Sequence, residues 1–471
     1  MTRSAARFAA LLLLAFAPLG CLVGPDFAPP AEPAPEAWRA PLSERLAADA
    51  PDDASLARWW DLLGDPVLGE LERRAFAGSR ELAIAEARLR EARARRSGAR
   101  AGLLPNSSAS ASAGRSHAER AMPETHESYD VGFDASWEID LFGGLRRGVE
   151  AASAELAASD ANLRAVRVSI AAEVAQAYAD LRALQHRIAL AEENVRAQSE
   201  TLDLTRWRSE AGLTTSLDVE QARANLEQTR AALPQLRSAL AASSARLAVL
   251  AGEPPGALDA LFAELAPVPT PPARIAVGVP AEMLARRPDV ARAERQLAAE
   301  TARIGVTKAE ALPRLSLTGS LGVDALAASN LFSAASYSSS VLGNLTQIVL
   351  DFGRVRATIR AQEAVRDAAL AELEATLLEA LEETENALVA FSQEEQRRDA
   401  LIAAADAAGL AAQLARDQYA AGLVDFEAVL AAERALFTSQ DQLAASEGEV
   451  ASNLARLYKA LGGGWQSGAT P

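Results

Sequence analysis

Residues 150–211 read EAASAELAASDANLRAVRVSIAAEVAQAYADLRALQHRIALAEENVRAQSETLDLTRWRSEA, without a glycine or a proline. Apolar residues recur in this stretch every seven positions, in two series: Leu156, Leu163, Ile170, Ala177, Leu184 and Ala191, and Val174, Leu181, Ile188, Val195 and Leu202. A seam of this length is typical of an α-helix that supercoils against neighbouring helices. At about 1.5 Å of rise per residue the helix is roughly 95 Å long. The stretch therefore predicts a helical rod that needs partners, from its own chain or from further copies.

The chain contains an internal repeat, which supplies some of these partners. Four short motifs recur, three at an offset of 210 residues and the last at 208: Ala211-Gly212-Leu213 and Ala421-Gly422-Leu423, Leu141-Phe142-Gly143 and Asp351-Phe352-Gly353, Arg246-Leu247 and Arg456-Leu457, Leu104-Pro105 and Leu312-Pro313. Each half is expected to run helix, two strands, long helix, turn and returning helix. Local breakers add detail: Pro234 is expected to kink the first returning helix, and Gly409 to break the second long helix before its turn.

The strands carry an alternating pattern. Between Tyr129 and Asp140, and between Leu315 and Asp324, every second residue is apolar and the others are polar or acidic. Weaker strands are expected at 106–114 and 338–350. Lipid outside and water inside a membrane barrel explain the alternation, and the lipid-facing side chains would be Tyr129, Val131, Phe133, Trp137, Ile139, Leu315, Leu317 and Leu321. Four strands cannot close a barrel, so several copies must complete it.

Composition excludes several functions. The 471 residues carry a net charge of −16, which argues against nucleic acid as a partner. Three histidines lie far apart and Cys21 is the only cysteine, so neither a metal site nor a Cys/His nucleophile can readily be built. No glycine-rich phosphate loop is present. We therefore expect no enzyme activity, no cofactor and no metal.

The amino terminus predicts export and lipidation. Residues 1–20 have the basic start and short apolar run of a signal peptide, and Gly20-Cys21 resembles a lipoprotein cleavage site. An unlipidated thiol after an ordinary signal peptide is the alternative. The remaining segments are expected to be an extended lipid-anchored tether (21–60), the first repeat (61–252), a proline-rich equatorial linker (253–285), the second repeat (286–462) and a flexible tail (463–471). Trp59-Trp60 is expected to serve packing.

Several motifs, in this order, resemble those of one family: Cys21-Leu-Val-Gly-Pro-Asp-Phe-Ala-Pro-Pro30, Trp59-Trp60 with Asp65-Pro66, Gly212-Leu213 with Leu217-Asp218-Val219, Arg286-Arg287-Pro288-Asp289-Val290 with Ala293-Glu294, and Gly422-Leu423. The chain resembles the outer membrane factor family of TolC-type exit ducts, and most of all its lipid-anchored efflux branch. The resemblance implies a homotrimer in the outer membrane of a Gram-negative bacterium, with a palmitate-bearing Cys21. Its twelve-stranded barrel, four strands from each copy, would be continued by a long helical barrel in the periplasm. The implied partners are outer-membrane lipid, a periplasmic adaptor (membrane fusion) protein and an inner-membrane RND-type transporter.

The turns between the long helices are the expected docking site for the adaptor, and their residues are Gly212, Leu213, Thr214, Gly422, Leu423 and Val424. The glycines also serve simply to reverse the chain. In the efflux branch the ninth residue after the second turn glycine is commonly an aspartate at the narrowest ring, whereas here it is Ala431. The resemblance implies that Glu427 supplies an acidic ring in the periplasmic gate and that Arg434 tethers the closed helices. The alternative is that Glu427 and Arg434 are simply exposed to solvent, which for charged residues near a helix end is as common as a specific role.

Two other functions remain open. The first is an exit duct of a type I protein secretion system, against which the lipoprotein signal and the Val23-Gly-Pro-Asp26 opening favour efflux of small molecules such as drugs and toxic compounds. The second is a lipid-anchored periplasmic coiled-coil scaffold. A scaffold needs no membrane strands, so the alternation in Tyr129–Asp140 argues against it.

Overall fold

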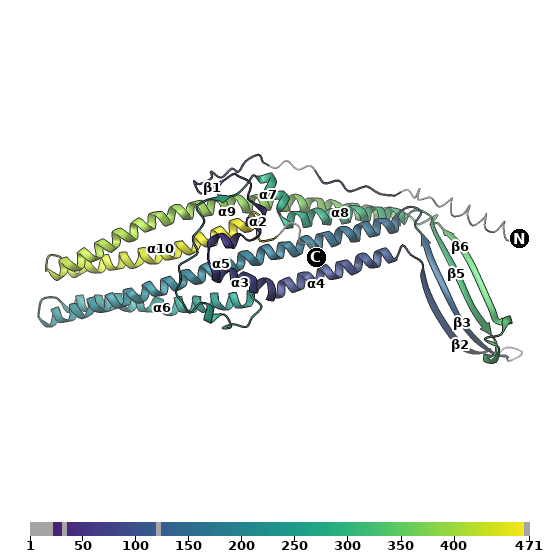
Figure 1. Cartoon of the computed structure of the whole chain (residues 1–471), viewed down its shortest axis with the longest axis horizontal. Helices are drawn as coiled ribbons and strands as arrows, with labels where there is room; N and C mark the ends of the chain where they lie inside the picture. Colours follow the sequence, from purple (N-terminus) through teal and green to yellow (C-terminus); the bar gives the residue numbers. More distant parts are fainter. Residues whose placement is uncertain (1–21, 31–34, 119–123, 466–471) are drawn as a thin grey trace. The chain divides into compact units, whose positions relative to one another are not determined.

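The computed structural model describes residues 22–30, 35–118 and 124–465, and most of these are helical. The internal repeat is confirmed by matched helix lengths. Helices α5 (Gly144–Glu210) and α9 (Arg354–Ala420) have 67 residues each, and the returning helices α6 (Ser216–Leu250) and α10 (Phe426–Ala460) have 35 each. The shorter helices α4 (Arg80–Ala101) and α8 (Pro288–Ala309) have 22 residues each. Figure 1 shows α6 returning along α5, and α10 along α9.

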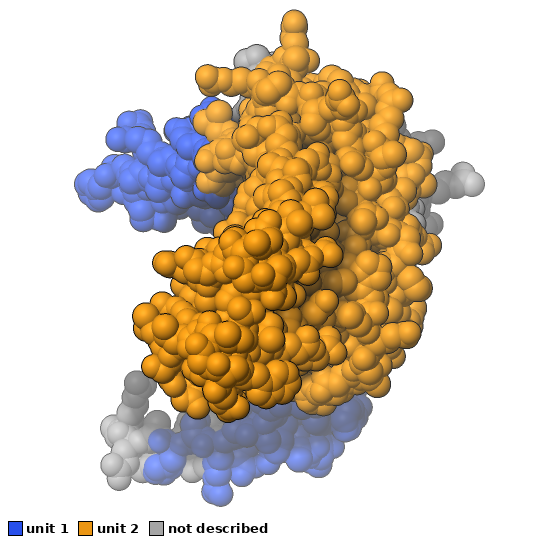
Figure 2. Space-filling view, turned by 90° about the vertical axis from the view of Figure 1, so that its left-hand side faces the viewer, with its two compact units in different colours: residues 1–31, 87–160, 292–375 blue, residues 32–86, 161–291, 376–471 orange. Residues whose placement is uncertain are grey.

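The chain forms two compact units, and each contains parts of both repeats (Figure 2). The first unit comprises residues 1–31, 87–160 and 292–375, and the second comprises 32–86, 161–291 and 376–471. The repeat is therefore a feature of the sequence that does not coincide with the compact units. Residues 1–21, which include the expected signal peptide and Cys21, and the end of the tail (466–471) lie outside the described residues.

The first unit contains a four-stranded antiparallel sheet in the order β2-β3-β5-β6 (Figure 1). Its strands are β2 (Asn106–Ala118), β3 (Glu124–Ile139), β5 (Arg314–Ala325) and β6 (Tyr337–Thr346). Within the described ranges, β2 and β6 each have a neighbour on one side only, so both edges of the sheet present unpaired backbone groups. The last strand is shorter than its expected range of 338–350, since regular pairing stops at Thr346.

The register of the sheet separates its two faces. Phe133 lies opposite Leu321 and Trp137 opposite Leu317, whereas Asp134 lies opposite Ser320. Because side chains alternate along a strand, these pairings place the predicted lipid-facing residues on one face and the polar residues on the other. Phe133 and Leu321 are 64% and 47% exposed, so the middle of the apolar face is open in the described chain. Trp137 on the same face is half-buried and donates from Nε1 to the Leu103 carbonyl at 3.0 Å.

The predicted break of the second long helix at Gly409 is wrong, because α9 continues through this residue. Helix α6 also continues through Pro234 without interruption, and the kink predicted there stays a prediction. A glycine inside a helix costs only about 1 kcal/mol relative to alanine, which tertiary packing offsets. A β-carbon placed on Gly409 would lie 3.9 Å from a methyl carbon of Leu436 on α10, so this part of α9 is packed against its neighbour.

The proline-rich segments contain short regular elements that the extended tether and linker did not predict. Strand β1 (Leu46–Ala47) pairs in parallel with β4 (Ile275–Ala276), which joins the tether to the linker. The same segments contain helix α2 (Asp53–Ala57), the 3-10 turns η1 (Trp59–Leu63) and η2 (Asp259–Leu261), and helix α7 (Pro280–Arg286). Helix α3 (Pro66–Gly78) follows the tether at the start of the first repeat. In the first unit, the 3-10 turns η3 (Ala328–Asn330) and η4 (Ala334–Ser336) connect β5 to β6.

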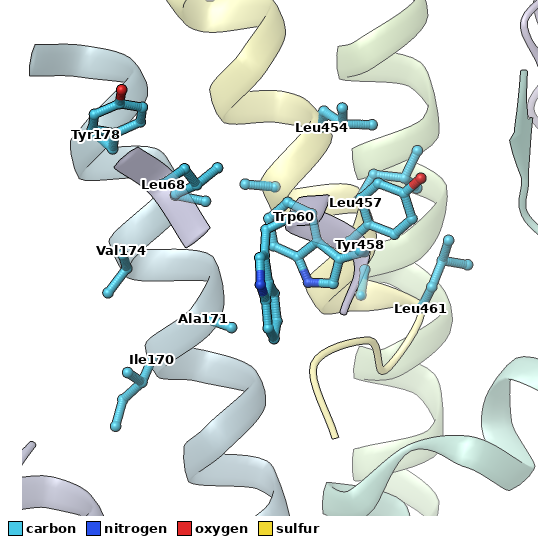
Figure 3. Packing of buried hydrophobic residues seen from close by; sticks show 14 of the residues in the cluster. Trp60, Leu68, Ile170, Ala171, Val174, Tyr178, Leu454, Leu457, Tyr458 and Leu461 are labelled. Carbon is cyan, nitrogen blue, oxygen red and sulfur yellow. The ribbon is translucent and has the colours of Figure 1, made fainter. Parts of the chain in front are cut away.

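The core of the second unit surrounds the tryptophan pair (Figure 3). Trp59 is fully buried and stacks on Tyr458 of α10 with ring centroids 4.9 Å apart. Trp60 is 6% exposed and packs beside Phe76 of α3. The expected packing role of the tryptophans is therefore confirmed, and the stacking of Trp59 on Tyr458 joins the end of the tether to the last helix of the second repeat.

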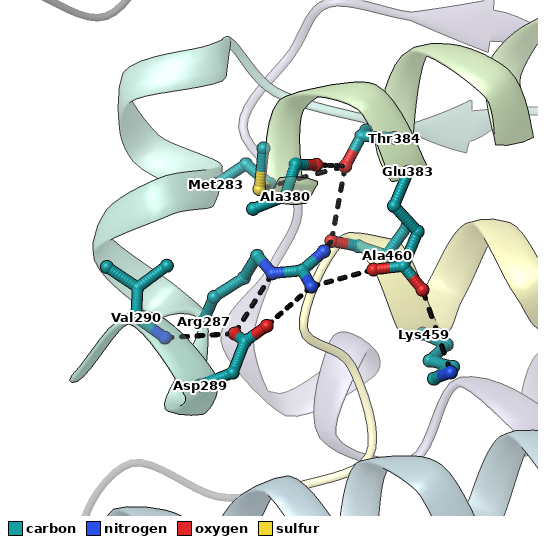
Figure 4. A network of polar contacts seen from close by, with 9 residues as sticks. All are labelled: Met283, Arg287, Asp289, Val290, Ala380, Glu383, Thr384, Lys459 and Ala460. Carbon is teal, nitrogen blue, oxygen red and sulfur yellow. Dashed lines mark hydrogen bonds and ion pairs between the residues drawn. The ribbon is translucent and has the colours of Figure 1, made fainter. Parts of the chain in front are cut away.

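A buried arginine joins α8, α9 and α10 in the same unit (Figure 4). Arg287 pairs with Asp289 and with Glu383 of α9, each at 2.7 Å, and donates to the carbonyl of Ala460 at the end of α10 at 2.8 Å. Burial alone would raise the pKa of Asp289, but hydrogen bonding and charge from Arg287 outweigh it and hold that pKa below its usual value. The motif Arg286-Arg287-Pro288-Asp289 is thus a structural junction of three helices.

Candidate functional site

The candidate site consists of the two turns that end the long helices. Gly212 and Gly422 both have a φ of 72°, which only glycine adopts at little cost. Around Gly212, the N–H of Leu213 donates to the carbonyl of Arg208 at 2.8 Å and the N–H of Gly212 donates to Ser209 at 3.0 Å. The second turn repeats this pattern through Gln418 and Tyr419. These paired bonds close a helix end and free the following residue to begin the return.

Polar side chains start each returning helix. Thr215 and Asp218 form a reciprocal capping box at the first residues of α6, and Asp425 accepts from the N–H of Ala428 at 3.1 Å at the start of α10. Thr214 also donates to the Asp218 carboxylate, and this hydrogen bond is the main cause of the lowered Asp218 pKa. Each turn is therefore held by its own backbone and caps.

The predicted docking residues differ in exposure. Leu213 and Leu423 are 69% and 75% exposed, so an apolar side chain projects from each turn. Thr214 and Val424 are half-buried, and Val424 packs against a small core that includes Tyr419. The two leucines are therefore the apolar side chains that the turns expose most, and Val424 packs beneath the second turn.

The three predicted gate residues share one face of α10. Glu427, Ala431 and Arg434 are spaced by four and three residues, which places them on one side of a helix, and all three are exposed. Arg434 donates from Nε to the Oδ1 of Asn225 on α6 at 3.0 Å. Arg434 therefore makes an interhelical contact of the kind that a tether requires, while Glu427 and Ala431 have open surroundings in the single chain.

A second set of residues, which the sequence analysis missed, ties the first hairpin to the second. At four positions of α5, each seven residues from the last, a polar side chain reaches a polar group of the second repeat. We call these contacts the polar ladder: Arg187 with Asp441 (2.7 and 3.0 Å), Asn194 with Gln440 (3.1 Å), Thr201 with Glu433 (2.8 Å), and Arg208 with the Tyr419 carbonyl (2.9 Å). These four polar residues also recur every seven positions within residues 150–211, and this spacing was the signal that could have revealed them. Only the apolar residues of the stretch were used for the prediction.

The end of the ladder is electrostatically unusual. Glu433 is 3% exposed and lies 3.2 Å from the guanidinium of Arg416, and its burial raises the pKa of its carboxyl although the Thr201 hydroxyl and Arg416 act against this. Arg208 lies 4.5 Å from the centre of the Tyr419 ring and also reaches the Ala420 carbonyl. A cation at the last carbonyls of α9 is stabilising because the carboxyl end of a helix is partly negative.

Neither a metal-binding cluster nor a membrane-spanning helix occurs among the described residues. No group of three or more His, Cys, Asp or Glu residues that could hold a metal ion occurs in the part of the chain that the structure describes. Among the helices of the same ranges, none has the length and apolar character needed to cross a membrane.

A sheet with one apolar and one polar face, followed by long paired helices with closed turns, defines a channel of the outer membrane factor class. The chain belongs to the outer membrane efflux protein family, whose profile matches residues 71–253 and 279–463. It is 33% identical to the pyoverdine export outer membrane protein OpmQ of Pseudomonas putida over 443 residues, which cover 92% of each chain. It is 32% identical to the outer membrane protein OprJ of Pseudomonas aeruginosa, covering 97% of this chain and 96% of OprJ.

Solved structures agree with this assignment. The outer-membrane channel OprN superimposes with a TM-score of 0.87 at 36% identity, covering 95% of this chain and all of OprN. The open state of the Neisseria gonorrhoeae MtrE channel gives 0.82 at 26% identity. The predicted family, fold class and Gram-negative outer-membrane location are therefore confirmed. The chain is an outer membrane efflux channel protein whose helical part lies in the periplasm, and it is not an enzyme.

Proposed function

We propose that this protein is the exit channel of a tripartite efflux system, and that it conducts small molecules passively from an adaptor and an RND-type pump to the exterior. The observation that carries the proposal is the open four-stranded sheet with opposite faces. Its two unpaired edges require other copies, and three copies would close a twelve-stranded barrel around the polar face. OpmQ is named for pyoverdine export, and small-molecule export is the function we infer for this chain.

Trimer formation and export provide the first test. We expect a heat-modifiable trimer in the outer-membrane fraction. Deletion of the gene should abolish export of a small dye and leave protein secretion unchanged. A monomer extracted without detergent would support the periplasmic scaffold. Loss of a secreted protein with unchanged dye export would support the type I secretion exit.

The adaptor is proposed to dock on Leu213 and Leu423, which project from the two turns. Replacing both with Asp should abolish crosslinking of the adaptor to the trimer, because an exposed apolar contact would be replaced by two charges. Val249→Asp is the matched control, since Val249 is 53% exposed at the opposite end of α6. Unchanged crosslinking and export in the double variant would remove the docking role.

The periplasmic gate is proposed to lie at Glu427, with Arg434 holding the helices closed through Asn225. Acidic groups repeated by symmetry at a constriction favour cations. Glu427→Ala should lower cation selectivity in planar bilayers, and Arg434→Ala should raise the mean conductance. Glu220→Ala, at an exposed site in the first turn of α6, is the control. If both gate variants behave like the control, the ring is not at these residues.

Cys21 is proposed to carry the lipid anchor. Mass spectrometry of the amino-terminal peptide should show an acylated Cys21, and Cys21→Ser should remove the acyl group. An unmodified thiol on the mature protein would contradict this.

A further inference from the structure

The connection between β6 and α9 exposes an apolar segment at the sheet end of the long helix. Residues 348–352 belong to no strand or helix, and Val349, Leu350 and Phe352 are 91%, 73% and 93% exposed. Asp351 fixes the segment from within by accepting from the N–H groups of Gly353 at 3.0 Å and Val355 at 2.8 Å. The segment is therefore held in place although its apolar side chains contact little of the described chain.

Phe352 shows that this conformation is imposed. Its φ of 53° makes it the one non-glycine residue with a positive φ among the described residues. A bulky aromatic residue is strained in this region of backbone space, and such strain is typical of functional positions. The strained backbone directs the Phe352 ring into solvent.

The internal repeat provides a comparison within the same chain. Phe142, the counterpart of Phe352, is half-buried because the amino-terminal segment lies over its bend. The N–H of Val23 donates to the Phe142 carbonyl at 3.1 Å, and a β-carbon on Gly143 would lie 3.1 Å from Leu22. The bend of the first repeat is thus covered by its own chain, whereas no described residue covers the bend of the second repeat in this way.

Unpaired arginines lie beside the uncovered bend. Arg356 and Arg360 are exposed, lie one turn apart on α9, and have no ion-pair or side-chain hydrogen-bond partner among the described residues. Basic residues in the first turns of a helix oppose its dipole, so helix stability does not account for them. Arg314 at the start of β5 and Arg100 at the end of α4 are also exposed and unpaired in the described chain. Other arginines of the first unit, such as Arg95, Arg146, Arg147 and Arg303, have carboxylate partners.

We propose that Phe352, Arg356 and Arg360 form a binding surface for anionic phospholipid in the periplasmic leaflet of the outer membrane. The apolar segment would enter the interfacial region of the leaflet, and the arginines would reach the phosphates, a combination typical of membrane-surface anchors. The local positive charge stands out in a chain with a net charge of −16, so charge complementarity selects a negatively charged occupant. The inference rests on the proposed function, which places the sheet in the membrane as part of a trimeric channel.

The test uses the purified full-length trimer, first shown to conduct ions in a planar bilayer, and then delipidated in a neutral detergent. Native mass spectrometry would count dioleoylphosphatidylglycerol molecules retained per trimer, with dioleoylphosphatidylcholine and inorganic phosphate as comparison probes. We expect preferential retention of phosphatidylglycerol, weakened by high salt. Retention should fall roughly fivefold for each arginine replaced in Arg356→Gln and Arg360→Gln.

Matched variants separate charge, shape and assembly. Arg356→Lys with Arg360→Lys should retain the lipid, and Arg223→Gln with Arg230→Gln, on the exposed surface of α6, should behave like the unchanged protein. Phe352→Gly suits the left-handed backbone and should still lower retention, because the ring is lost. Equal retention of both lipids by the unchanged trimer would overturn the proposal. Full lipid retention by the variant that carries Arg356→Gln and Arg360→Gln would also overturn it. Dissociation of this variant into monomers before any lipid is added would overturn it too, because the arginines would then serve contacts between copies.

Discussion

Glu72 on α3 is a carboxyl group without a partner. It is 1% exposed, and neither carboxyl oxygen has a hydrogen-bond partner among the described residues. Burial raises its pKa well above the ordinary value of 4.5. The folded protein therefore binds this proton more tightly than the unfolded chain. The resulting stabilisation is complete below the unfolded pKa and is lost as the pH rises through the folded pKa.

Glu72→Gln is expected to raise the denaturant midpoint at pH 8 and to change it little at pH 5. The gain at pH 8 should be roughly 1–3 kcal/mol, because an amide removes the cost of a buried, unpaired acid. Tryptophan fluorescence during unfolding of the detergent-solubilised trimer measures this. Glu86→Gln, at an exposed site on α4, should show no such dependence on pH. An equal gain at both pH values would contradict the assignment.

Neighbouring arginines at the junction of α7 and α8 should differ in their effect on stability. Arg287→Ala would leave Asp289, Glu383 and the Ala460 carbonyl without their shared donor. We expect a loss of about 1–3 kcal/mol of unfolding free energy, since the two carboxylates are 31% and 38% exposed. Arg286→Ala should cost at most about 1 kcal/mol, since its partner Asp53 is 68% exposed. The denaturant midpoints of the two variants are compared. Similar losses of stability would show that Arg287 is not the main residue stabilising the junction of α8, α9 and α10.

At the scale of elements, the polar ladder makes the end of α9 depend on α5. Arg208→Ala removes the cation at the last carbonyls of α9, and amide exchange in residues 412–420 should become about fivefold faster, equivalent to about 1 kcal/mol. Arg206→Ala is the control, because Arg206 pairs at 3.6 Å with Asp203 of its own helix. Hydrogen exchange followed by mass spectrometry measures both variants. Equal protection from amide exchange in the two variants would mean that the end of α9 is stable without the contact from α5.

For the whole molecule, membrane insertion should distinguish the two faces of the sheet. Leu321→Arg places a charge on the apolar face and should cost roughly 2–4 kcal/mol near the centre of the bilayer. Ser320→Arg, on the adjacent residue and the opposite face, should be tolerated. The fraction of heat-modifiable trimer in the outer-membrane fraction measures the difference. A comparable loss of trimer in both variants would indicate that the two faces of the sheet do not face lipid on one side and water on the other.

Local sequence signals predicted the periodic parts of this structure and missed what depends on packing. The heptad seam, the 210-residue offset and the alternation in Tyr129–Asp140 were sufficient for the helices and strands. Gly409 misled because propensity is a weak constraint inside a well-packed helix. The burial of Glu433 and the exposure of Phe352 depend on which segments meet in space, and no local pattern encodes that.

The equal lengths of α5 and α9, and of α6 and α10, constrain how this family can change in length. The turns of both hairpins are joined by Arg208 and Tyr419, so they must end together. A deletion in one helix would shift one turn away from the other and move every later ladder contact out of register. Evolution can therefore shorten or lengthen such a channel only by matched insertions or deletions in four helices, in steps of whole heptads. Related chains of different length should show this coordinated pattern of gaps.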